Sequence, residues 1–231
     1  MGGVCHDEAD KHVENMAPSL PKADPATDCG MTSPRLLTVS AVEPDEALLA
    51  QAARLVHDGG LVAFPTETVY GLAADATNPQ AIDRLNRVKG RPPEKPYSIH
   101  LYDVEQLHRF VSEVPSLARH LIERFWPGPL TIVMPGKDGA TVGFRLPSHP
   151  VARMFLRACQ RPVVAPSANR SGFPPPTDGK EVLAALDGQF DCLLDAGPTP
   201  LGRESTVVSV IGGQCDVLRE GAIPREKILS D

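Results

Sequence analysis

The chain has 231 residues and a formal net charge of −6 at pH 7; 42% of its residues are hydrophobic and 23% are charged. This composition is ordinary for a soluble globular protein, and no run approaches the roughly 18 apolar residues of a membrane span. The negative charge argues against a protein whose main task is binding nucleic acid, because that affinity comes largely from neutralising phosphates. It leaves room for a local basic cleft.

The beginning of the chain and its cysteines favour a cytoplasmic protein. The first eight residues contain neither a basic segment nor an apolar core, so they do not form a secretory signal. The five cysteines are scattered and include no CxxC pair, which favours reduced thiols over a disulfide framework or a zinc site. Cysteines and histidines near the start match no recognised ligand spacing, so we predict no metal held by the protein itself.

Residues 1–35 differ in composition from the rest of the chain. They mix Asp, Glu, Lys, Pro, Ser and Thr with few large apolar residues. Such a segment cannot bury enough apolar surface to offset the cost of ordering it. We therefore predict a disordered tail over residues 1–35 and a single domain over residues 36–231.

The domain is expected to begin with an edge strand at residues 37–39. Pro44 and Asp45 then open a helix with apolar residues at helical spacing, and Gly59 is a typical helix stop. An apolar run over residues 61–64 follows as a strand. Asn78 and Pro79 are typical of an N-cap and a first helical position. This second helix is expected to end at a segment with the sequence KGRPPEKP.

Strands and short helices alternate through the rest of the chain. We predict helices after Asp103 and over residues 116–125, 151–159 and 181–186. We predict strands over residues 97–101, 130–134, 141–146, 162–165, 192–194, 205–211 and 215–219. Gly212 and Gly213 separate the last two strands and indicate a hairpin. The alternation predicts an α/β fold with a mixed sheet.

Two polar turns directly follow predicted strands, at residues 65–71 (PTETVYG) and 166–172 (PSANRSG). Open α/β sheets bind ligands just past the carboxyl ends of their strands. Small hydroxyls and backbone N–H groups in such a turn are able to bind phosphate. The residues alone are equally consistent with hydrogen-bonded turns that bind nothing.

Several cations lie where strands and helices are expected to end. The KGRPPEKP segment carries Lys89, Arg91 and Lys95, and its prolines stiffen the backbone that holds them. Arg145 and Arg219 end two predicted strands. A fixed group of Lys and Arg is what a polyphosphate or a carboxylate requires. A solvated cluster at a helix C-terminus is the simpler alternative.

Familiar nucleotide and hydrolase motifs are absent from the sequence. There is no GxxxxGK[ST], GxGxxG, HExxH or GxSxG pattern. Ser167 therefore lacks the sequence motif that would mark it as a hydrolase nucleophile. Any ATP site would have to be of another kind.

Seven motifs follow one another in the order PTETVYG, KGRPxxKP, WPGPLT, FRLP, APSANRSG, STVV and LREGAI. In this order the chain resembles the Sua5/YciO/YrdC family over residues 36–228. The resemblance implies an α/β, YrdC-like (RibB-like) fold, in which a twisted mixed sheet with flanking helices carries a positively charged cavity.

The resemblance also implies an activity. Members of the family form L-threonylcarbamoyladenylate and pyrophosphate from L-threonine, bicarbonate and ATP, usually with Mg²⁺. The expected enzyme is thus a nucleotidyltransferase that feeds the t⁶A modification of tRNA at position 37 through a downstream transferase complex. A weak contact with tRNA or double-stranded RNA is a further expectation, and no membrane partner is implied.

Carried over motif by motif, the resemblance assigns roles to individual residues. It implies threonine contacts from Thr68, His100, Arg145, Ala165 and Ser205. It implies contacts with ATP or its adenylate from Arg91, Lys95, Thr141, Ser167, Asn169 and Arg219. Lys89 and Arg91 would neutralise charge as catalytic residues, and positioning plus neutralisation requires no side-chain nucleophile.

Two features depart from the family pattern. Pro175 stands where many members have a serine that touches the nucleotide, and the chain stops at Asp231, as in the short, single-domain type. Three alternatives stay open: a paralogue that makes another carbamoyl-adenylate, an RNA-binding module of the same fold, and a fold retained without activity.

Overall fold

The computed structural model describes residues 33–92 and 96–230. All described residues belong to one compact unit, Met31–Asp231, the second of two units into which the chain divides. The predicted tail, residues 1–35, lies almost entirely outside the described residues and stays a prediction. Lys95 also lies outside them.

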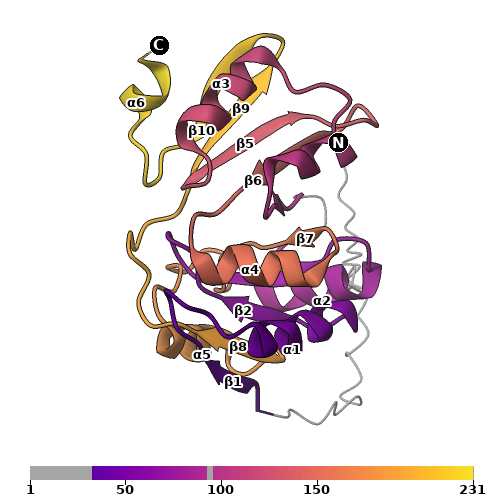
Figure 1. The fold of residues 1–231 in the computed structure, drawn as a ribbon, viewed down its shortest axis with the longest axis vertical. Helices are drawn as coiled ribbons and strands as arrows, with labels where there is room; N and C mark the ends of the chain where they lie inside the picture. Colours follow the sequence, from indigo (N-terminus) through magenta and orange to yellow (C-terminus); the bar gives the residue numbers. More distant parts are fainter. Residues whose placement is uncertain (1–32, 93–95, 231) are drawn as a thin grey trace, which may run out of the picture. The chain divides into compact units, whose positions relative to one another are not determined.

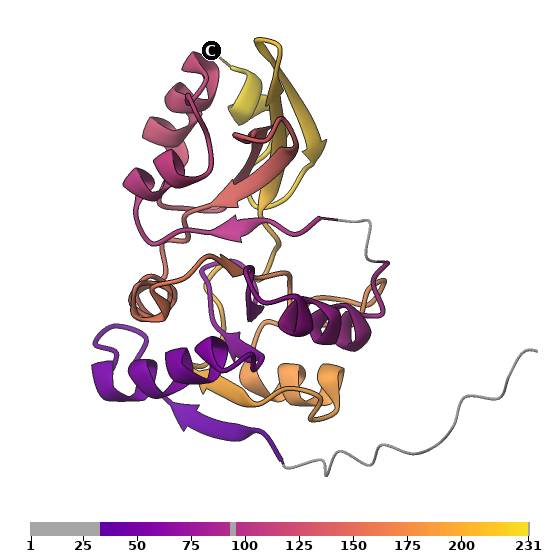
Figure 2. The same ribbon diagram turned by 90° about the vertical axis from the view of Figure 1, so that its right-hand side faces the viewer.

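One ten-stranded sheet runs through the second unit in the order β1-β8-β2-β3-β7-β4-β6-β5-β9-β10 (Figure 1 and Figure 2). Its strands are β1 (Arg35–Thr38), β2 (Val62–Phe64), β3 (Gly71–Asp75), β4 (Ile99–His100), β5 (Leu130–Pro135), β6 (Thr141–Arg145), β7 (Val163–Val164), β8 (Cys192–Asp195), β9 (Thr206–Ile211) and β10 (Gln214–Arg219). Parallel pairs such as β1–β8 and β5–β9 stand beside antiparallel pairs such as β2–β3 and β5–β6. The predicted mixed sheet is confirmed.

Helices flank this sheet, as predicted. They are α1 (Glu46–His57), α2 (Pro79–Lys89), the 3₁₀ helix η1 (Val104–Arg109), α3 (Ser116–Phe125), α4 (Pro150–Cys159), α5 (Gly179–Leu186) and α6 (Arg225–Leu229). Asp45 and Asn78 cap α1 and α2 through their side chains, and Pro79 occupies the first turn of α2. Gly59 has a φ of +85°, a conformation that glycine adopts without strain, and it ends α1 as expected.

In the first half of the sheet, strands β8, β2, β3 and β7 are covered on both faces, whereas the edge strand β1 is mostly exposed. On one face α1 and α4 lie side by side (Figure 1) and pack on β2, β7 and β8 through residues such as Val56, Phe155 and Phe64. On the other face α2 and α5 pack on the same strands through Leu85 and Val182. Because both faces are buried, β2 is apolar throughout and β8 is apolar from Cys192 to Leu194, as is typical of such strands.

The second half of the sheet is covered differently. There β5, β6 and β9 pack against η1, α3 and α6 in a separate cluster of buried residues. Along β5, Leu130, Ile132 and Met134 belong to this cluster, whereas Thr131 and Val133 point the other way and line a cavity. Side chains alternate between the faces of a strand, so one face of this half is free to form a site.

Two elements were not predicted from the sequence. β3 has the sequence GLAAD, which is poor in the branched and aromatic residues typical of strands. It forms because β2 and β7 pair with it from both sides. α6 has five residues, too few for a periodic pattern.

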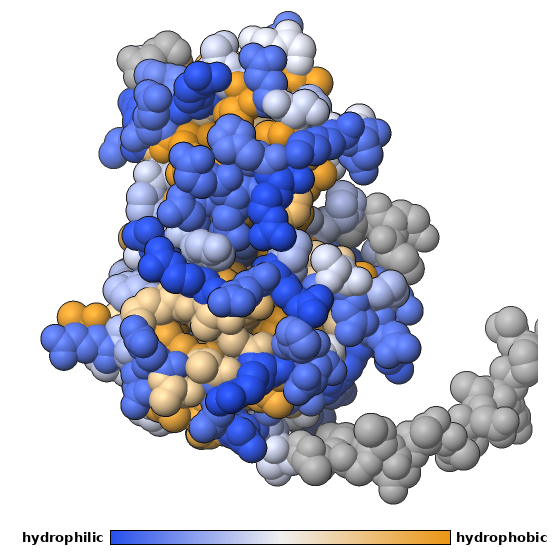
Figure 3. Space-filling view, turned by 45° about the vertical axis from the view of Figure 1, so that its right-hand side comes forward, coloured by the Kyte–Doolittle hydropathy of each residue, from blue (hydrophilic) through white to orange (hydrophobic). Residues whose placement is uncertain are grey.

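No helix formed by the described residues is long and apolar enough to cross a membrane. Figure 3 shows hydrophilic residues over much of one face, with apolar residues visible between them. Among the large hydrophobic residues that are exposed in the described ranges, Phe173 is the aromatic one. It lies in the loop between β7 and α5.

Candidate active site

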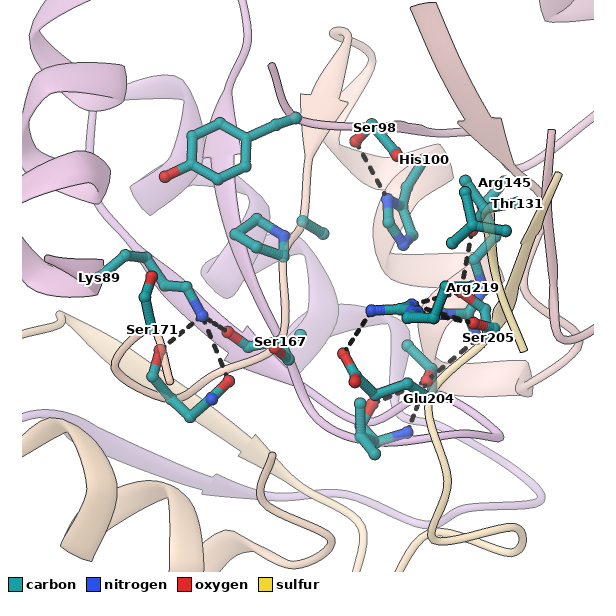
Figure 4. Close-up of a pocket in the computed structure, with 18 of the residues that line it drawn as sticks. Lys89, Ser98, His100, Thr131, Arg145, Ser167, Ser171, Glu204, Ser205 and Arg219 are labelled. Atoms are coloured by element: carbon teal, nitrogen blue, oxygen red, sulfur yellow. Dashed lines mark hydrogen bonds and ion pairs between the residues drawn. The ribbon is translucent and has the colours of Figure 1, made fainter. Parts of the chain in front are cut away.

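A cavity of about 660 Å³ lies over the uncovered face of the second half of the sheet. Its walls come from the 65–71 turn, the end of α2, strands β4 to β6, the loop after β7, and the segment that leads into β9. Figure 4 shows Lys89 on one side of this pocket and His100, Arg145 and Ser205 on the other. The two sides differ in how their polar groups are held.

The 65–71 turn forms part of the cavity wall and is held by hydrogen bonds between its own residues. It connects the antiparallel strands β2 and β3. Thr66 Oγ1 donates to Val69 O over 2.7 Å and lies 2.8 Å from Thr68 Oγ1. Tyr70 OH donates to Gly197 O over 2.7 Å, and burial raises the pKa of this phenol above its ordinary value. The turn is therefore a fixed support and not a mobile loop.

Arg145, at the end of β6, is the central side chain of the arginine side, which we define as His100, Thr131, Arg145 and Ser205. It is only 6% exposed. Its Nη2 donates to Glu67 Oε1 over 2.9 Å and to Thr68 Oγ1 over 2.7 Å. Its buried Nε has no hydrogen-bond partner in the described chain. All side-chain hydrogen bonds of Arg145 to described residues come from Nη2, so Nη1 is left to meet an incoming acceptor such as a carboxylate.

His100, at the end of β4, supplies a neutral imidazole to the same side. Burial lowers its pKa to about 3, and the nearby Arg145 charge adds to this effect. Nδ1 lies 3.4 Å from Ser98 O. Because a carbonyl only accepts, Nδ1 carries the proton and Nε2 is left as an acceptor. His100 therefore offers an acceptor beside a cation, a pair suited to a ligand with both donors and a carboxylate.

Two hydroxyls complete the arginine side. Thr131 Oγ1 and Ser205 Oγ lie 2.9 Å apart, although the residues are 74 positions apart in sequence. Parallel pairing of β5 and β9 brings them together. They place two small hydrogen-bonding groups on the floor of the cavity.

Arg219, at the end of β10, holds the segment that carries Ser205. Its Nη2 donates to Ser205 O over 2.9 Å and its Nη1 to Glu204 Oε1 over 2.9 Å. A Cβ at Gly221 would collide with the backbone of Glu204 and Ser205. Glycine is needed there because the two chain segments approach too closely for a side chain.

Lys89, the last residue of α2, organises the loop side, which we define as Lys89, Ser167 and Asn169. It is 3% exposed. Nζ donates to the backbone oxygens of Ser167 and Asn169 and to Asn169 Oδ1, the last over 3.2 Å. Burial lowers the pKa of this amine to about 8, and the nearby Arg91 charge adds to the effect. All three ammonium donors are thus directed to the loop itself.

The loop after β7 is fixed by further bonds and presents its hydroxyls to the cavity. Asn169 Nδ2 donates to Arg170 O and Phe173 O, and Ser171 N donates to Lys89 O. Ser167 and Ser171 line the cavity, and their hydroxyls form no hydrogen bond with the described residues. Such a cradle of hydroxyls and N–H groups is suited to phosphate oxygens.

Arg91 lies past the end of α2 and also lines the cavity. Its Nη2 donates to Pro96 O over 2.9 Å, and its guanidinium carbon lies 4.6 Å above the ring of Tyr97. Tyr97 OH in turn donates to Asn86 Oδ1 over 2.8 Å. The aromatic ring therefore orients the cation across the mouth of the cavity.

Most of the residues selected from the sequence meet in this cavity. Those that line it are Lys89, Arg91, His100, Arg145, Ala165, Ser167, Asn169, Ser205 and Arg219. Their individual roles stay predictions.

Two predicted residues do not line the cavity. Thr68 is fully buried behind Arg145, which it contacts directly. Thr141 is exposed at the beginning of β6, whereas Arg145 ends the same strand. Thr141 therefore lies about 13 Å along the strand from Arg145, and its contact with ATP stays a prediction.

Sequence reasoning missed other lining residues, among them Thr131, Phe173 and Glu204. Thr131 lies in the WPGPLT motif, and its position opposite Ser205 depends on strand pairing that the sequence does not reveal. The signal for Phe173 was its place directly after the PSANRSG turn, as an aromatic residue followed by three prolines.

The described residues contain no group of three or more His, Cys, Asp or Glu able to hold a metal ion. Four basic side chains line the cavity, Lys89, Arg91, Arg145 and Arg219, and Glu204 is the lining carboxylate in the described chain. That carboxylate is paired with Arg219 over 2.9 Å. The donor set does not form a protein cage for Mg²⁺, which commonly binds through substrate phosphates.

Comparison with known proteins places the chain in a family. The family model Sua5_yciO_yrdC, described as "Telomere recombination", matches residues 54–221. The threonylcarbamoyl-AMP synthase of Bacillus subtilis is 43% identical over 190 residues, which cover 78% of this chain and 55% of that protein. A relative from Mycobacterium tuberculosis is 35% identical over 202 residues, covering 83% of this chain and 93% of the relative.

Solved structures agree with the sequence comparison. Pyrococcus abyssi Sua5 in complex with L-threonine superimposes with a TM-score of 0.79 at 39% identity, over 84% of this chain and 60% of that one. This chain therefore spans only a little over half the length of several proteins it matches. Sequence and fold together show that the chain belongs to the Sua5/YciO/YrdC family.

Proposed function

We propose that the chain forms L-threonylcarbamoyl-AMP and pyrophosphate from L-threonine, bicarbonate and ATP. Relatives that carry the name threonylcarbamoyl-AMP synthase are 37–43% identical. A homologous structure contains L-threonine, at 39% identity. The observation that carries the proposal is Arg145, a guanidinium that Glu67 and Thr68 hold through Nη2 in the wall of a polar cavity.

The arginine side has the groups that threonine requires. The guanidinium of Arg145 would bind the carboxylate, with Glu67 holding the guanidinium in place over 2.9 Å. Thr131 and Ser205 would exchange hydrogen bonds with the substrate hydroxyl. The neutral imidazole of His100 would accept a hydrogen bond from the amino group before that nitrogen reacts.

The loop side has the groups that a polyphosphate requires. Ser167, Ser171 and the N–H groups of their loop would bind phosphate oxygens, and Arg91 would add a charge at the mouth of the cavity. Lys89 would act mainly by fixing the loop, since its donors point to loop oxygens. Arg219, held by Glu204, would stand between the two sides.

The reaction needs the two sides in one cavity. Bicarbonate gives CO₂ and hydroxide; the amino nitrogen of threonine bonds to the carbon of CO₂ and loses a proton to the hydroxide, so that carbamate and water form. The carbamate oxygen then attacks the α-phosphorus of ATP, the bond to the β-phosphate bridging oxygen breaks, and pyrophosphate leaves. A carbamate is short-lived in water, so holding both reactants together is the main catalytic contribution. Fixed cations and hydroxyls stabilise the charge that develops at phosphorus.

Mg²⁺ would enter as part of the substrate, as Mg·ATP. It would partly neutralise the phosphates while the protein binds the remaining oxygens. The cavity wall described above offers no metal cage of its own, so we assign no protein ligand to the ion. We also propose a cytoplasmic location and a downstream transferase complex that passes the threonylcarbamoyl group to tRNA.

The proposal is tested by measuring pyrophosphate release with ATP, Mg²⁺, bicarbonate and L-threonine, omitting one component at a time. Full release is expected only in the complete mixture. Release that needs no amino acid but is stimulated by carbamoyl phosphate would replace this proposal with a carbamoyl-adenylate activity. The adenylate product should be identified by its mass in the same samples.

A further inference from the structure

An exposed aromatic ring stands at the rim of the cavity. Phe173 is 67% exposed, yet it lines the cavity. It also lines a neighbouring hollow of about 520 Å³ between the 174–176 prolines and α5. Phe173 is absent from the buried clusters of the described chain, so packing of the fold does not explain the ring.

The backbone beneath this ring is held on both sides. Phe173 O accepts from Asn169 Nδ2 over 2.6 Å, and Phe173 N donates to Arg170 O over 3.1 Å. Pro176 O accepts from Tyr70 N over 2.9 Å, and the intervening prolines restrict φ. The ring is thus an exposed apolar surface on a rigid support, which lowers the entropic penalty of binding against it.

The position of Phe173 follows from the same contacts that hold the loop side. Asn169 accepts from Lys89 Nζ through Oδ1 and donates to Phe173 O through Nδ2. One amide therefore links the phosphate-type cradle to the aromatic ring. A ligand with a charged phosphate end and a flat apolar end would therefore be able to contact the cradle with its phosphates and the ring of Phe173 with its flat end.

From this arrangement we infer that Phe173 stacks on the base of the nucleotide substrate, with the 520 Å³ hollow receiving the base edge. This deepens the proposed function, because it assigns the base of ATP to a surface of this chain. Stacking of a base on an aromatic ring contributes about 1–3 kcal/mol by alanine substitution. The small side chains of Ala184 and Ala185 on α5 line the hollow. Its polar lining residues are Arg170, Thr177 and Glu181.

The test separates the base from the phosphates by comparing Mg·ATP with Mg·triphosphate in calorimetric titrations. Phe173→Ala should weaken ATP binding by about five- to 150-fold and leave triphosphate binding within about twofold. Phe173→Tyr should restore ATP binding. Leu218→Ala is the matched control, because Leu218 is 61% exposed on β10 and does not line the cavity; it should change neither affinity.

A second readout follows the base directly. The H2 and H8 protons of adenine should move upfield when ATP binds the native protein, because they enter the ring current of Phe173, and the Phe173→Ala variant should abolish this shift. Unchanged ATP affinity in Phe173→Ala, or equal loss of ATP and triphosphate, would overturn the inference. These are binding measurements, so a protein that binds ATP through Phe173 but releases no pyrophosphate would refute only the proposed function.

Discussion

The two sides of the cavity use their cations in opposite ways. On the arginine side, Arg145 uses only Nη2 for its side-chain bonds to described residues, among them Glu67, and keeps Nη1 for a ligand. On the loop side, Lys89 directs its donors to oxygens of Ser167 and Asn169. One cation is prepared to contact a ligand, and the other fixes the loop that contacts it. A basic residue in a motif can therefore serve a site directly or through the backbone it supports.

The largest effect is expected from removing Arg145. Arg145→Ala leaves Glu67 buried without its charged partner, which destabilises a fold by about 3–5 kcal/mol, and it should lower pyrophosphate release by more than about a hundredfold. Urea unfolding and pyrophosphate release measure the two effects.

A double variant separates these two consequences. Glu67→Gln combined with Arg145→Ala removes the unpaired charge, so much of the stability should return while activity stays lost. Activity that returned together with stability would show that Arg145 serves only the fold.

Next in size are two variants that compare Lys89 with Arg91. Each of Lys89→Met and Arg91→Ala should reduce turnover by about ten- to a hundredfold. Only Lys89→Met should speed amide hydrogen exchange across residues 167–172, because it leaves the oxygens of Ser167 and Asn169 without donors. Arg87→Ala, on the same helix but absent from the cavity lining, is the control. If Lys89→Met lost activity while the loop kept its protection, Lys89 would act on the substrate itself.

A smaller effect is expected from pH. Burial lowers the pKa of Lys89 to about 8, so the ammonium loses its proton above that pH and turnover should fall about tenfold by pH 9. Lys89→Arg should move this fall to higher pH, while the substrates titrate identically in both proteins.

Stability should respond to pH in the opposite direction. The unfolded amine titrates near its ordinary value of 10.5, so between pH 8 and 10.5 the unfolded state binds more protons, and the contribution of Lys89 to stability rises with pH. Thermal unfolding of the native protein and of Lys89→Arg, measured from pH 7.5 to 10, would detect this rise in stability.

The turnover measurement has its own contradicting outcome. If the turnover of the native protein stayed level up to pH 9.5, the proposed role of the Lys89 charge would be wrong.

Local signals in the sequence were enough for much of the fold. The caps at Asp45 and Asn78, the stop at Gly59 and the Gly212–Gly213 hairpin each follow from local chemistry, and the structure has all of them. β3 was missed because its residues carry no strand preference, and only pairing with β2 and β7 makes it a strand.

The sequence predicted which residues belong to the site better than it predicted how they are arranged in space. Motif order selected residues such as Arg145 and Ser205, but not the pairing that sets Thr131 2.9 Å from Ser205. Thr141 and Arg145 were predicted near opposite ends of one strand, and β6 has them there. The sequence also does not predict the hydrogen bonds from Lys89 to the loop, because they depend on how closely α2 approaches residues 166–172.

The most direct test of the proposed function is pyrophosphate release with different amino acids under identical ATP, Mg²⁺ and bicarbonate. Valine has the shape of threonine but lacks its hydroxyl, and a site built to hydrogen-bond a hydroxyl rejects such an analogue strongly because its own polar groups stay unpaired. With Thr131 and Ser205 facing the substrate, threonine should support the fastest release, serine a slower one, and valine almost none. Release with valine within about threefold of threonine would contradict the assignment of the arginine side to threonine.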